Sequence, residues 1–406
     1  MADAKQNRSV LSAIPKSVWA LGMVSLLMDT SSEAIHALLP VYLVTVMGTS
    51  MVTVGIIEGI AEATAHITKI FSGAISDWLG RRKLLAVLGY GLSALTKPVF
   101  PLAPNVGWLV GARFVDRIGK GIRGAPRDAL VADITPEDMR GAAYGLRQSL
   151  DTVGAFLGPL MAIALMWLTA DNFRATFWVA VIPAVICVGV LLAFVHEPDR
   201  GTGTKRLRAP LSLQEIRTLG PRFWQVTAVA VVFALARFSE AFLILRAETA
   251  GLMIALVPLV LVVMNIAYAL AAYPAGALSD RTNRMTVLMI GLVLLVLADL
   301  LLAYGTGIAL IGLGIVLWGL HMGFTQGLFS ALVADTAPAE LRGTAFGAYN
   351  LMSGLMTLAA SVLAGGLWDL TGYQGTFLAG GGFALLALAG VLILRPRFDG
   401  AGASDT

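Results

Sequence analysis

Long apolar stretches alternate with short polar connections along the whole chain. The stretches lie at about residues 17–47, 51–76, 83–103, 106–133, 143–168, 176–195, 222–248, 252–276, 286–305, 308–333, 344–368 and 374–394. A helix that crosses a membrane needs about 20 predominantly apolar residues. The pattern therefore predicts an all-α membrane protein with twelve transmembrane helices.

Composition agrees with this prediction. Of the 406 residues, 57% are hydrophobic and 13% charged, against about 45–50% and about 25% in soluble domains. Twelve spans occupy roughly 240 positions, which leaves no length for an appended soluble catalytic domain. We expect no enzyme activity, no cofactor, no bound metal, no nucleic acid and no obligate protein partner. The lone Cys187 lies in an apolar run and is expected to be a small core residue.

Positive charge marks one side of the predicted membrane protein. Lys and Arg gather at 80–83, 197–222, 281–284 and 395–397, all on the same side of the helix count. By the positive-inside rule this side is cytoplasmic, so both termini should be cytoplasmic. The polar linker divides the chain into an N-terminal six-helix bundle (1–196), a linker (197–221) and a C-terminal six-helix bundle with a short tail (222–406).

The two halves repeat one another. The segment from Gly73 to Asp77 matches that from Gly276 to Asp280 at an offset of 203, and the segment ending at Asp133 matches one ending at Asp335 at an offset of 202. Matches at nearly constant offset indicate two pseudo-symmetric bundles.

The loop GAISDWLGRRKLL resembles the signature loop of the major facilitator superfamily. The matching residues are Gly73, Asp77, Gly80, Arg81 and Arg82, while the C-terminal copy has Asn283 in place of the second Gly. The segment 117–125 is similar to the second motif of the family, and the resemblance covers essentially the whole chain. It implies secondary transport by alternating access.

A weaker resemblance concerns the direction of transport. Gly154, Gly158 and Pro159 resemble the Gly-x-x-x-Gly-Pro motif of the antiporter members, without the closing Gly-Gly. This motif favours export.

Acids within the first two helices are candidates for proton coupling. An ionisable side chain in the hydrocarbon region costs about 2.5 to 3.5 kcal/mol, so it normally faces a cavity or pairs. Asp29, Glu33 and His36 share one face of the first helix, and Glu58, Glu62, His66 and Lys69 share one face of the second. The expected proton-coupling residues are Glu62, Glu33, Asp29 and Glu58.

The predicted solute site combines bases of the first half with polar residues of the second. The fourth helix carries a basic stripe that its repeat lacks, since Lys120 corresponds to Met322. The expected substrate-binding residues are Arg117, Arg113, Lys97, Lys120, Glu240, Asn265, His321, Gln326 and Asn350. Five acids and five bases near this site could also neutralise one another, although such a network adds little stability over apolar packing.

Residues nearer the cytoplasmic side are expected to act in gating. They are Asp77, Arg81, Arg82, Arg127 and Asp280. Asp299, like Asp151 with Arg147, is expected to form a local pair or a polar helix contact.

We interpret the sequence as that of a proton-coupled transporter of a small polar, anionic or zwitterionic organic solute, with export favoured. No phosphate-binding loop of an ATPase is present. An alternative is divalent-metal transport by the acids with His36 and His66, against which the five neighbouring cations argue. A membrane enzyme or sensor is a third alternative. The expected partners are the solute, protons and the lipid bilayer of a bacterial inner membrane.

Overall fold

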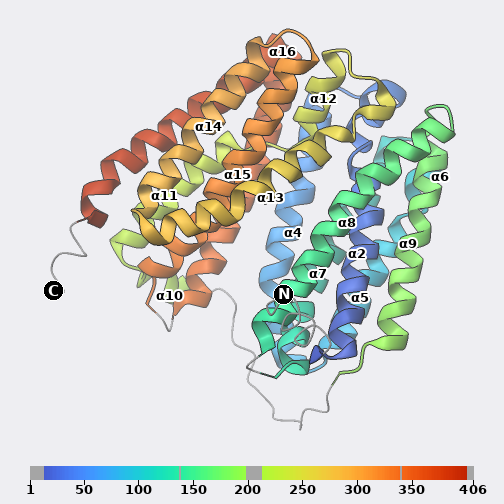
Figure 1. Ribbon diagram of the computed structural model, residues 1–406, viewed down its shortest axis with the longest axis horizontal. Helices are drawn as coiled ribbons and strands as arrows, with labels where there is room; N and C mark the ends of the chain where they lie inside the picture. Colours follow the sequence, from blue (N-terminus) through green and yellow to red (C-terminus); the bar gives the residue numbers. More distant parts are fainter. Residues whose placement is uncertain (1–12, 137–138, 198–212, 339–340, 400–406) are drawn as a thin grey trace, which may run out of the picture. The chain divides into compact units, whose positions relative to one another are not determined.

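The computed structural model describes residues 13–136, 139–197, 213–338 and 341–399, and the regular elements in these ranges are all helices. The first half contains α2 (Lys16–His36), α3 (Leu39–Val41), the π-helix η1 (Tyr42–Val46), α4 (Met51–Leu79), α5 (Arg82–Thr96), α6 (Val99–Leu102), α7 (Val106–Ile134), α8 (Arg140–Leu168) and α9 (Phe173–Phe194). The second contains α10 (Leu213–Arg217), α11 (Pro221–Ala236), α12 (Ala241–Thr249), the 3₁₀-helix η3 (Ile254–Leu256), α13 (Leu259–Arg281), α14 (Arg284–Tyr304), α15 (Ile308–Thr336) and α16 (Arg342–Asp399) (Figure 1).

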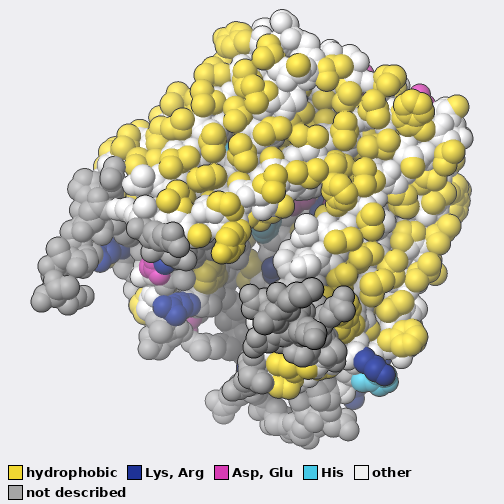
Figure 2. All heavy atoms as spheres, in the orientation of Figure 1, with side chains coloured by type: hydrophobic (Ala, Val, Ile, Leu, Met, Phe, Trp, Pro, Cys, Tyr) yellow, Lys and Arg dark blue, Asp and Glu magenta, His cyan; other side chains and the backbone are white. Residues whose placement is uncertain are grey.

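The helices confirm the all-α membrane class. Among the described residues, eight stretches are long and apolar enough to cross a membrane. The last of these, Thr344–Leu394, bends at Gly372 (φ 78°) and holds two helices. Three long helices fall outside the eight stretches, namely the charge-bearing α2, α4 and α7, and adding them gives a count consistent with twelve. Hydrophobic side chains cover most of the face seen in Figure 2.

The chain forms two compact units. Unit 1 comprises residues 1–39 and 64–209, and unit 2 comprises residues 40–63 and 210–406. The sequence-based division differs, since residues 40–63 fall with the second half. The expected linker, 197–221, lies largely outside the described residues.

Helix packing repeats between the units. In unit 1, α2 packs against α8 and α9, and α5 packs against α7 and α9. In unit 2, α11 packs against α16, and α14 packs against α15 and α16. These are equivalent pairs in the order of the two halves, as the sequence repeat predicts.

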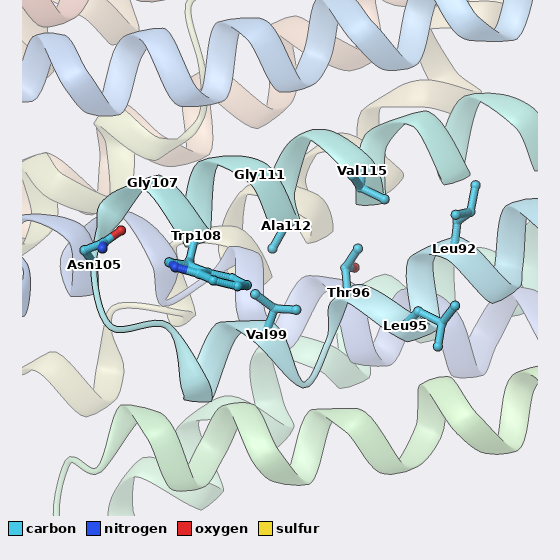
Figure 3. Close-up of a pocket in the computed structure, with 10 residues that line it drawn as sticks. All are labelled: Leu92, Leu95, Thr96, Val99, Asn105, Gly107, Trp108, Gly111, Ala112 and Val115. Carbon is cyan, nitrogen blue, oxygen red and sulfur yellow. The ribbon is translucent and has the colours of Figure 1, made fainter.

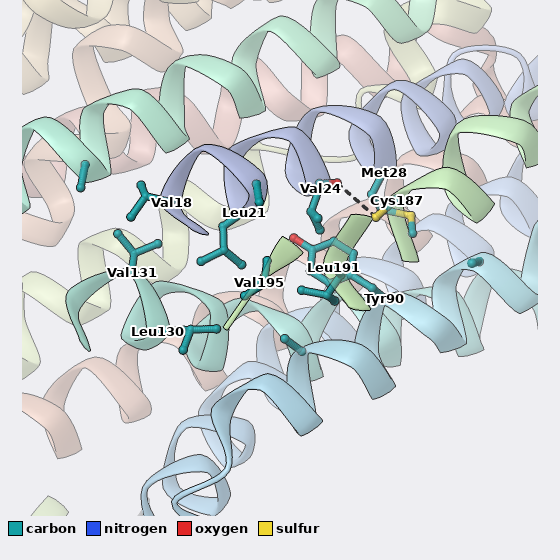
Figure 4. Close-up of a cluster of buried hydrophobic side chains, with 14 of the residues drawn as sticks. Val18, Leu21, Val24, Met28, Tyr90, Leu130, Val131, Cys187, Leu191 and Val195 are labelled. Atoms are coloured by element: carbon teal, nitrogen blue, oxygen red, sulfur yellow. Dashed lines mark hydrogen bonds between the residues drawn. The ribbon is translucent and has the colours of Figure 1, made fainter. Parts of the chain in front are cut away.

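The core of unit 1 lies where α2, α5, α7 and α9 meet (Figure 4). Leu21 and Val24 of α2 pack there with Tyr90 of α5 and Leu191 of α9. Cys187 is fully buried in this cluster, and its thiol donates a hydrogen bond to the Val24 carbonyl at 3.2 Å. The expected core role of Cys187 is confirmed.

Two glycines bring α8 close to α2. A Cβ on Gly154 would lie 2.4 Å from the Leu26 carbonyl oxygen, and one on Gly158 would lie 2.8 Å from the Thr30 carbonyl oxygen. The pair that resembles the antiporter motif therefore serves helix packing, because small residues allow membrane helices to approach closely.

The start of α4 is bound to α16 within unit 2. The backbone N–H groups of Met51 and Val52 donate to the Asp369 carboxylate at 3.0 and 2.9 Å. A Cβ on Gly55 would lie 2.1 Å from the Ser361 carbonyl oxygen, so the two backbones are in contact. Asp369 thus supplies the acceptors that the first turn of α4 lacks.

Candidate functional site

A buried ion pair joins α5 and α7 in unit 1. Lys97 follows the last residue of α5 directly, and its Nζ lies 3.0 Å from the Asp116 carboxylate and 2.9 Å from Ser32 Oγ. Lys97 is 1% exposed and Asp116 3% exposed. Such burial requires that each charge be compensated.

Further bases surround Asp116. Arg113, Arg117 and Arg123 are buried on α7, and all three act electrostatically on the Asp116 carboxylate together with Lys97. Four basic side chains of α5 and α7 thus gather around one buried carboxylate.

Asp29 lies on the α2 side of this network. Its carboxylate is 3.9 Å from Arg123 Nη2 and within hydrogen-bonding reach of the Asp151 carboxyl group. Arg123 also donates to Ser93 Oγ at 2.6 Å and lies over the Tyr90 ring, 4.7 Å from its centroid. Asp29 thus lies beside both a second acid and a base.

A second group of ionisable side chains lies in unit 2, around Arg237. Arg237 follows α11, where residues 237–240 interrupt the helix before α12. Glu240 and Glu62 act electrostatically on it, as do the Tyr268 and Tyr349 hydroxyls. With its amide oxygen turned towards the guanidinium, Gln326 accepts from Nη1 at 3.3 Å and from Nη2 at 3.1 Å.

Aromatic side chains border this group. The Arg237 guanidinium lies 6.0 Å from the Phe233 ring centroid, and Phe233 stacks on Phe329 at 4.9 Å. His321 is fully buried and meets the ring of Trp318 at 5.3 Å. The surroundings of Arg237 are therefore partly polar and partly aromatic.

Within each unit, the structure brings several of the expected site residues together. Lys97, Arg113 and Arg117 gather in unit 1, and Lys120, which is exposed, acts on Asp29 from α7. The set in unit 2 contains Glu62, Glu240, Gln326 and His321. Asn265 and Asn350 are partly exposed on α13 and α16.

The remaining expected coupling residues lie elsewhere. Glu33 pairs with His36 at 3.5 Å along α2, and Glu58 is fully buried on α4. His66 is exposed. Among the described residues no group of three His, Cys, Asp or Glu side chains is placed to hold a metal ion.

Of the expected gating residues, Arg82 forms a contact that repeats between the halves. Arg82 Nη1 lies 2.7 Å from the Asp133 carboxylate, and the equivalent Arg284 contacts Asp335. Arg81 is exposed. The side chains of Asp77 and Asp280 lie outside the described part of the chain.

Arg127, also expected to act in gating, bonds within unit 1. Its Nη1 donates to Ser25 Oγ at 2.9 Å and to the Asp151 carboxylate at 3.4 Å. The expected pair of Asp151 with Arg147 is present, at 3.6 Å.

Sequence reasoning passed over Arg237 and left the surroundings of Asp299 open. Arg237 is a charged residue inside the apolar run 226–239, which alone marks it as a candidate. The sequence predicts a local pair or a polar helix contact for Asp299, and within the described residues its buried carboxylate oxygens have no hydrogen-bond partner. Gly380 and Gly381 lie beside this carboxylate, and neither offers a side-chain donor.

A cavity of about 580 Å³ lies between α5, α6 and α7 (Figure 3). Leu92, Leu95, Val99 and Trp108 contribute most of its apolar wall, and none of its ten lining residues is ionisable. Since Leu95 and Trp108 are 75% and 57% exposed, this groove belongs to the outer apolar surface and not to the charged sites.

Membrane-crossing helices in two repeated halves, with ionisable side chains buried in mid-span, define a membrane transporter. The chain belongs to the major facilitator superfamily, whose sequence profile matches residues 21–361 and 241–405. It is therefore an integral membrane transporter of a small-molecule solute, and the resemblance in the signature loop is confirmed.

Three similar proteins illustrate this membership. An uncharacterised MFS-type transporter of Methanocaldococcus jannaschii is 30% identical over 94% of this chain and 95% of its own length. A gentisate transporter of Corynebacterium glutamicum is 27% identical over 85% and 80%. The crystal structure of the nucleoside transporter NupG superposes with a TM-score of 0.77 at 14% identity over 94% of this chain and 99% of NupG, which shows the shared fold.

Proposed function

We propose that this protein is a proton-coupled antiporter that exports a small organic anion or zwitterion. The observation that carries the proposal is the gathering of buried bases around Asp116, where Lys97, Arg113, Arg117 and Arg123 all act electrostatically on one carboxylate. In a low-dielectric site a base attracts an anion more strongly than it does in water. The similarity to a transporter of gentisate, a carboxylate, supports the same class of solute.

Acids beside bases supply the proton coupling. Asp29 faces Arg123 in unit 1, and Glu62 faces Arg237 in unit 2. A carboxyl group whose basic neighbour changes between conformations binds a proton in one and releases it in the other. Glu33 and Glu58 are further candidates on the same two helices.

The proposal includes an orientation. The Lys and Arg residues of the loops support cytoplasmic termini in a bacterial inner membrane. The halves 1–196 and 222–406 would then alternate access, with Asp77, Arg81, Arg82, Arg127 and Asp280 controlling the cytoplasmic side. The resemblance of Gly154, Gly158 and Pro159 to the antiporter motif supports export.

Transport by the purified protein in liposomes tests this function. A panel of organic anions, zwitterions and divalent metal ions is offered with and without an imposed pH gradient. We expect a member of the first two groups to accumulate against its gradient, and a protonophore to abolish the accumulation. Transport of metal ions alone, or accumulation indifferent to pH, would refute the proposal.

Neutral variants test the coupling acids. Asp29→Asn, Glu33→Gln and Glu62→Gln each mimic a protonated acid. We expect loss of pH-driven accumulation, with solute exchange preserved, in at least one of them. If all three variants accumulate solute like the unmodified protein, coupling through these acids is wrong.

A further inference from the structure

Asp299 is a buried acid of unit 2 that the proposed function does not use. Its side chain lies on α14, and the residue is 1% exposed. Within the described residues neither of its carboxylate oxygens has a hydrogen-bond partner. An ionised carboxylate in such a place is costly, because burial removes its water and no donor replaces that water. A neutral, protonated carboxyl group avoids most of this cost.

Glycines of α16 pack against this carboxyl group. A Cβ on Gly380 would lie 2.8 Å from Asp299 Oδ2 and 2.9 Å from a ring carbon of Phe238, and a Cβ on Gly381 would lie 3.5 Å from Asp299 Cβ. Neither glycine has a side chain that could donate, and the backbone N–H groups inside a helix are bonded within that helix. The close packing of α14 and α16 here therefore offers the carboxyl group no donor.

One buried base is bound a turn away along α14, and it has other acceptors. Arg246 of α12 donates from Nε to the Leu302 carbonyl and from Nη2 to the Gly305 carbonyl, each at 2.8 Å. Its guanidinium also lies over the Tyr373 ring, 3.9 Å from the ring centroid. Arg246 thus caps the end of α14 and does not pair with Asp299.

Other ionisable groups of the surrounding elements also lie apart from the Asp299 carboxylate. They are Tyr268 of α13, His321 of α15, Tyr349 of α16, and Arg237 and Glu240 at the interruption before α12. Tyr268, Tyr349 and Glu240 act on Arg237, and His321 meets the Trp318 ring. In the part of the chain that the structure describes, none of these groups bonds to Asp299.

Asp299 lies near one end of its membrane span. Tyr304, the last residue of α14, follows five residues later, which is about 8 Å along a helix. In the proposed orientation α14 begins at the cytoplasmic side, so this end is the outer one. The path of a proton to Asp299 is therefore shorter from outside than from the cytoplasm.

We propose that Asp299 is a proton-binding site, loaded while α14 and α16 pack together at Gly380 and Gly381 and emptied when they separate there. On emptying, the O–H bond of the carboxyl group breaks and the proton passes to the water that enters. The packed state then binds one proton more than the separated state, so its share falls as the pH rises. The inference goes beyond the proposed function, since it concerns neither the solute nor the coupling acids of α2 and α4.

Infrared spectroscopy tests whether the proton is present. The purified full chain in lipid is measured at about pH 8, where an aspartic acid in water is ionised. We expect a C=O stretching band of a protonated carboxyl group that Asp299→Asn lacks. Asp171→Asn is the control, because Asp171 is exposed between α8 and α9, and it should keep the band. Identical spectra of the unmodified protein and Asp299→Asn in this region would show that Asp299 is ionised, and the proposal would be wrong.

Hydrogen exchange tests whether the proton holds the helices together. Exchange of the α14 amides around residue 299 is followed at several pH values in the unmodified protein and in Asp299→Asn, whose side chain is neutral throughout. The ratio of the two exchange rates should rise about tenfold per pH unit, because only the unmodified protein releases a proton on opening. A ratio independent of pH refutes the link between the proton and the packing.

A second neutral variant guards both measurements. If Asp299→Asn does not fold, Asp299→Leu takes its place, since a buried charged group can often be replaced by an apolar one. Neither measurement uses a solute. Loss of the proposed antiport therefore leaves this inference standing, and failure of this inference leaves the antiport standing.

Discussion

At the scale of single residues, Lys97 and Asp116 form a buried ion pair within the proposed solute site. Their 3.0 Å contact is almost fully buried, and further bases stand close to Asp116. Replacing a buried ion pair by apolar residues is often neutral or stabilising, whereas removal of one partner leaves a buried charge. The pair is therefore retained for a reason other than stability, and solute binding is the reason that we propose.

A double-mutant cycle tests this reading. Asp116→Ala should destabilise the protein by about 3–5 kcal/mol, because Lys97 loses its partner. Lys97→Met combined with Asp116→Leu should recover most of this loss, measured by unfolding in detergent. The same double variant should not transport solute. If it transports at the normal rate, the pair serves only the fold.

Several residues of the candidate site could be predicted from the sequence, because an ionisable residue within an apolar run is rare and usually functional. Lys97, Arg113 and Arg117 were expected near the solute, and the structure gathers them around Asp116. The pairing itself could not be predicted. A charge at a given depth has several possible partners, and only helix packing decides that Lys97 meets Asp116 while Asp299 meets glycines.

At the scale of elements, the approach of α2 and α8 depends on Gly154 and Gly158. The contact at Gly158 also positions Glu33, whose Cβ would lie 2.8 Å from a Cβ at that glycine. A larger residue there separates the helices and moves an acid of the proposed coupling set.

Alanine substitutions test how closely α2 and α8 pack. Gly158→Ala should destabilise the protein by about 1–3 kcal/mol through overpacking, seen as a lower melting temperature in detergent. Gly145→Ala is the matched control, since it is on the same helix and has nothing within 4 Å of its Cβ. Equal melting temperatures for the two variants would contradict the close approach.

Helix ends were predicted closely, whereas breaks within helices were not. The expected stretch 106–133 and the observed α7 (Val106–Ile134) differ by one residue at the end. The expected stretch 222–248 gave no sign of the interruption at 237–240, because Ser239 depends on Ser361, far along the chain. A hydrophobic pattern predicts which residues lie in lipid. It does not predict which distant side chain accepts a hydrogen bond from a backbone N–H.

At the scale of the whole molecule, the repeat separates shared architecture from specialised chemistry. Arg82 with Asp133 and Arg284 with Asp335 are equivalent pairs, each joining the start of a third helix to the end of a fourth. The buried bases of α7 have no such copy, since Arg123 corresponds to Thr325 in α15. What occurs twice maintains the fold, and what occurs once is where specificity should lie.

The proposed orientation is testable with one reagent. In sealed right-side-out cells, a membrane-impermeant thiol reagent should modify Asn105→Cys, which is exposed between α6 and α7, and should not modify Thr204→Cys in the loop between halves. The native Cys187 is fully buried and should give little background. Modification of Thr204→Cys from outside would reverse the orientation.

The charged side chains of α7 also affect how the protein is made. Arg113, Asp116, Arg117, Lys120 and Arg123 lie on one helix, and each charge near mid-membrane opposes insertion by about 2.5–3.5 kcal/mol. This helix is not among the stretches apolar enough to cross alone. It follows α5 after a short connection, and Lys97 at the end of α5 neutralises Asp116. We therefore expect α7 to enter the bilayer together with α5 as a helical hairpin, so the residues that we propose to bind the solute would also set the order of assembly.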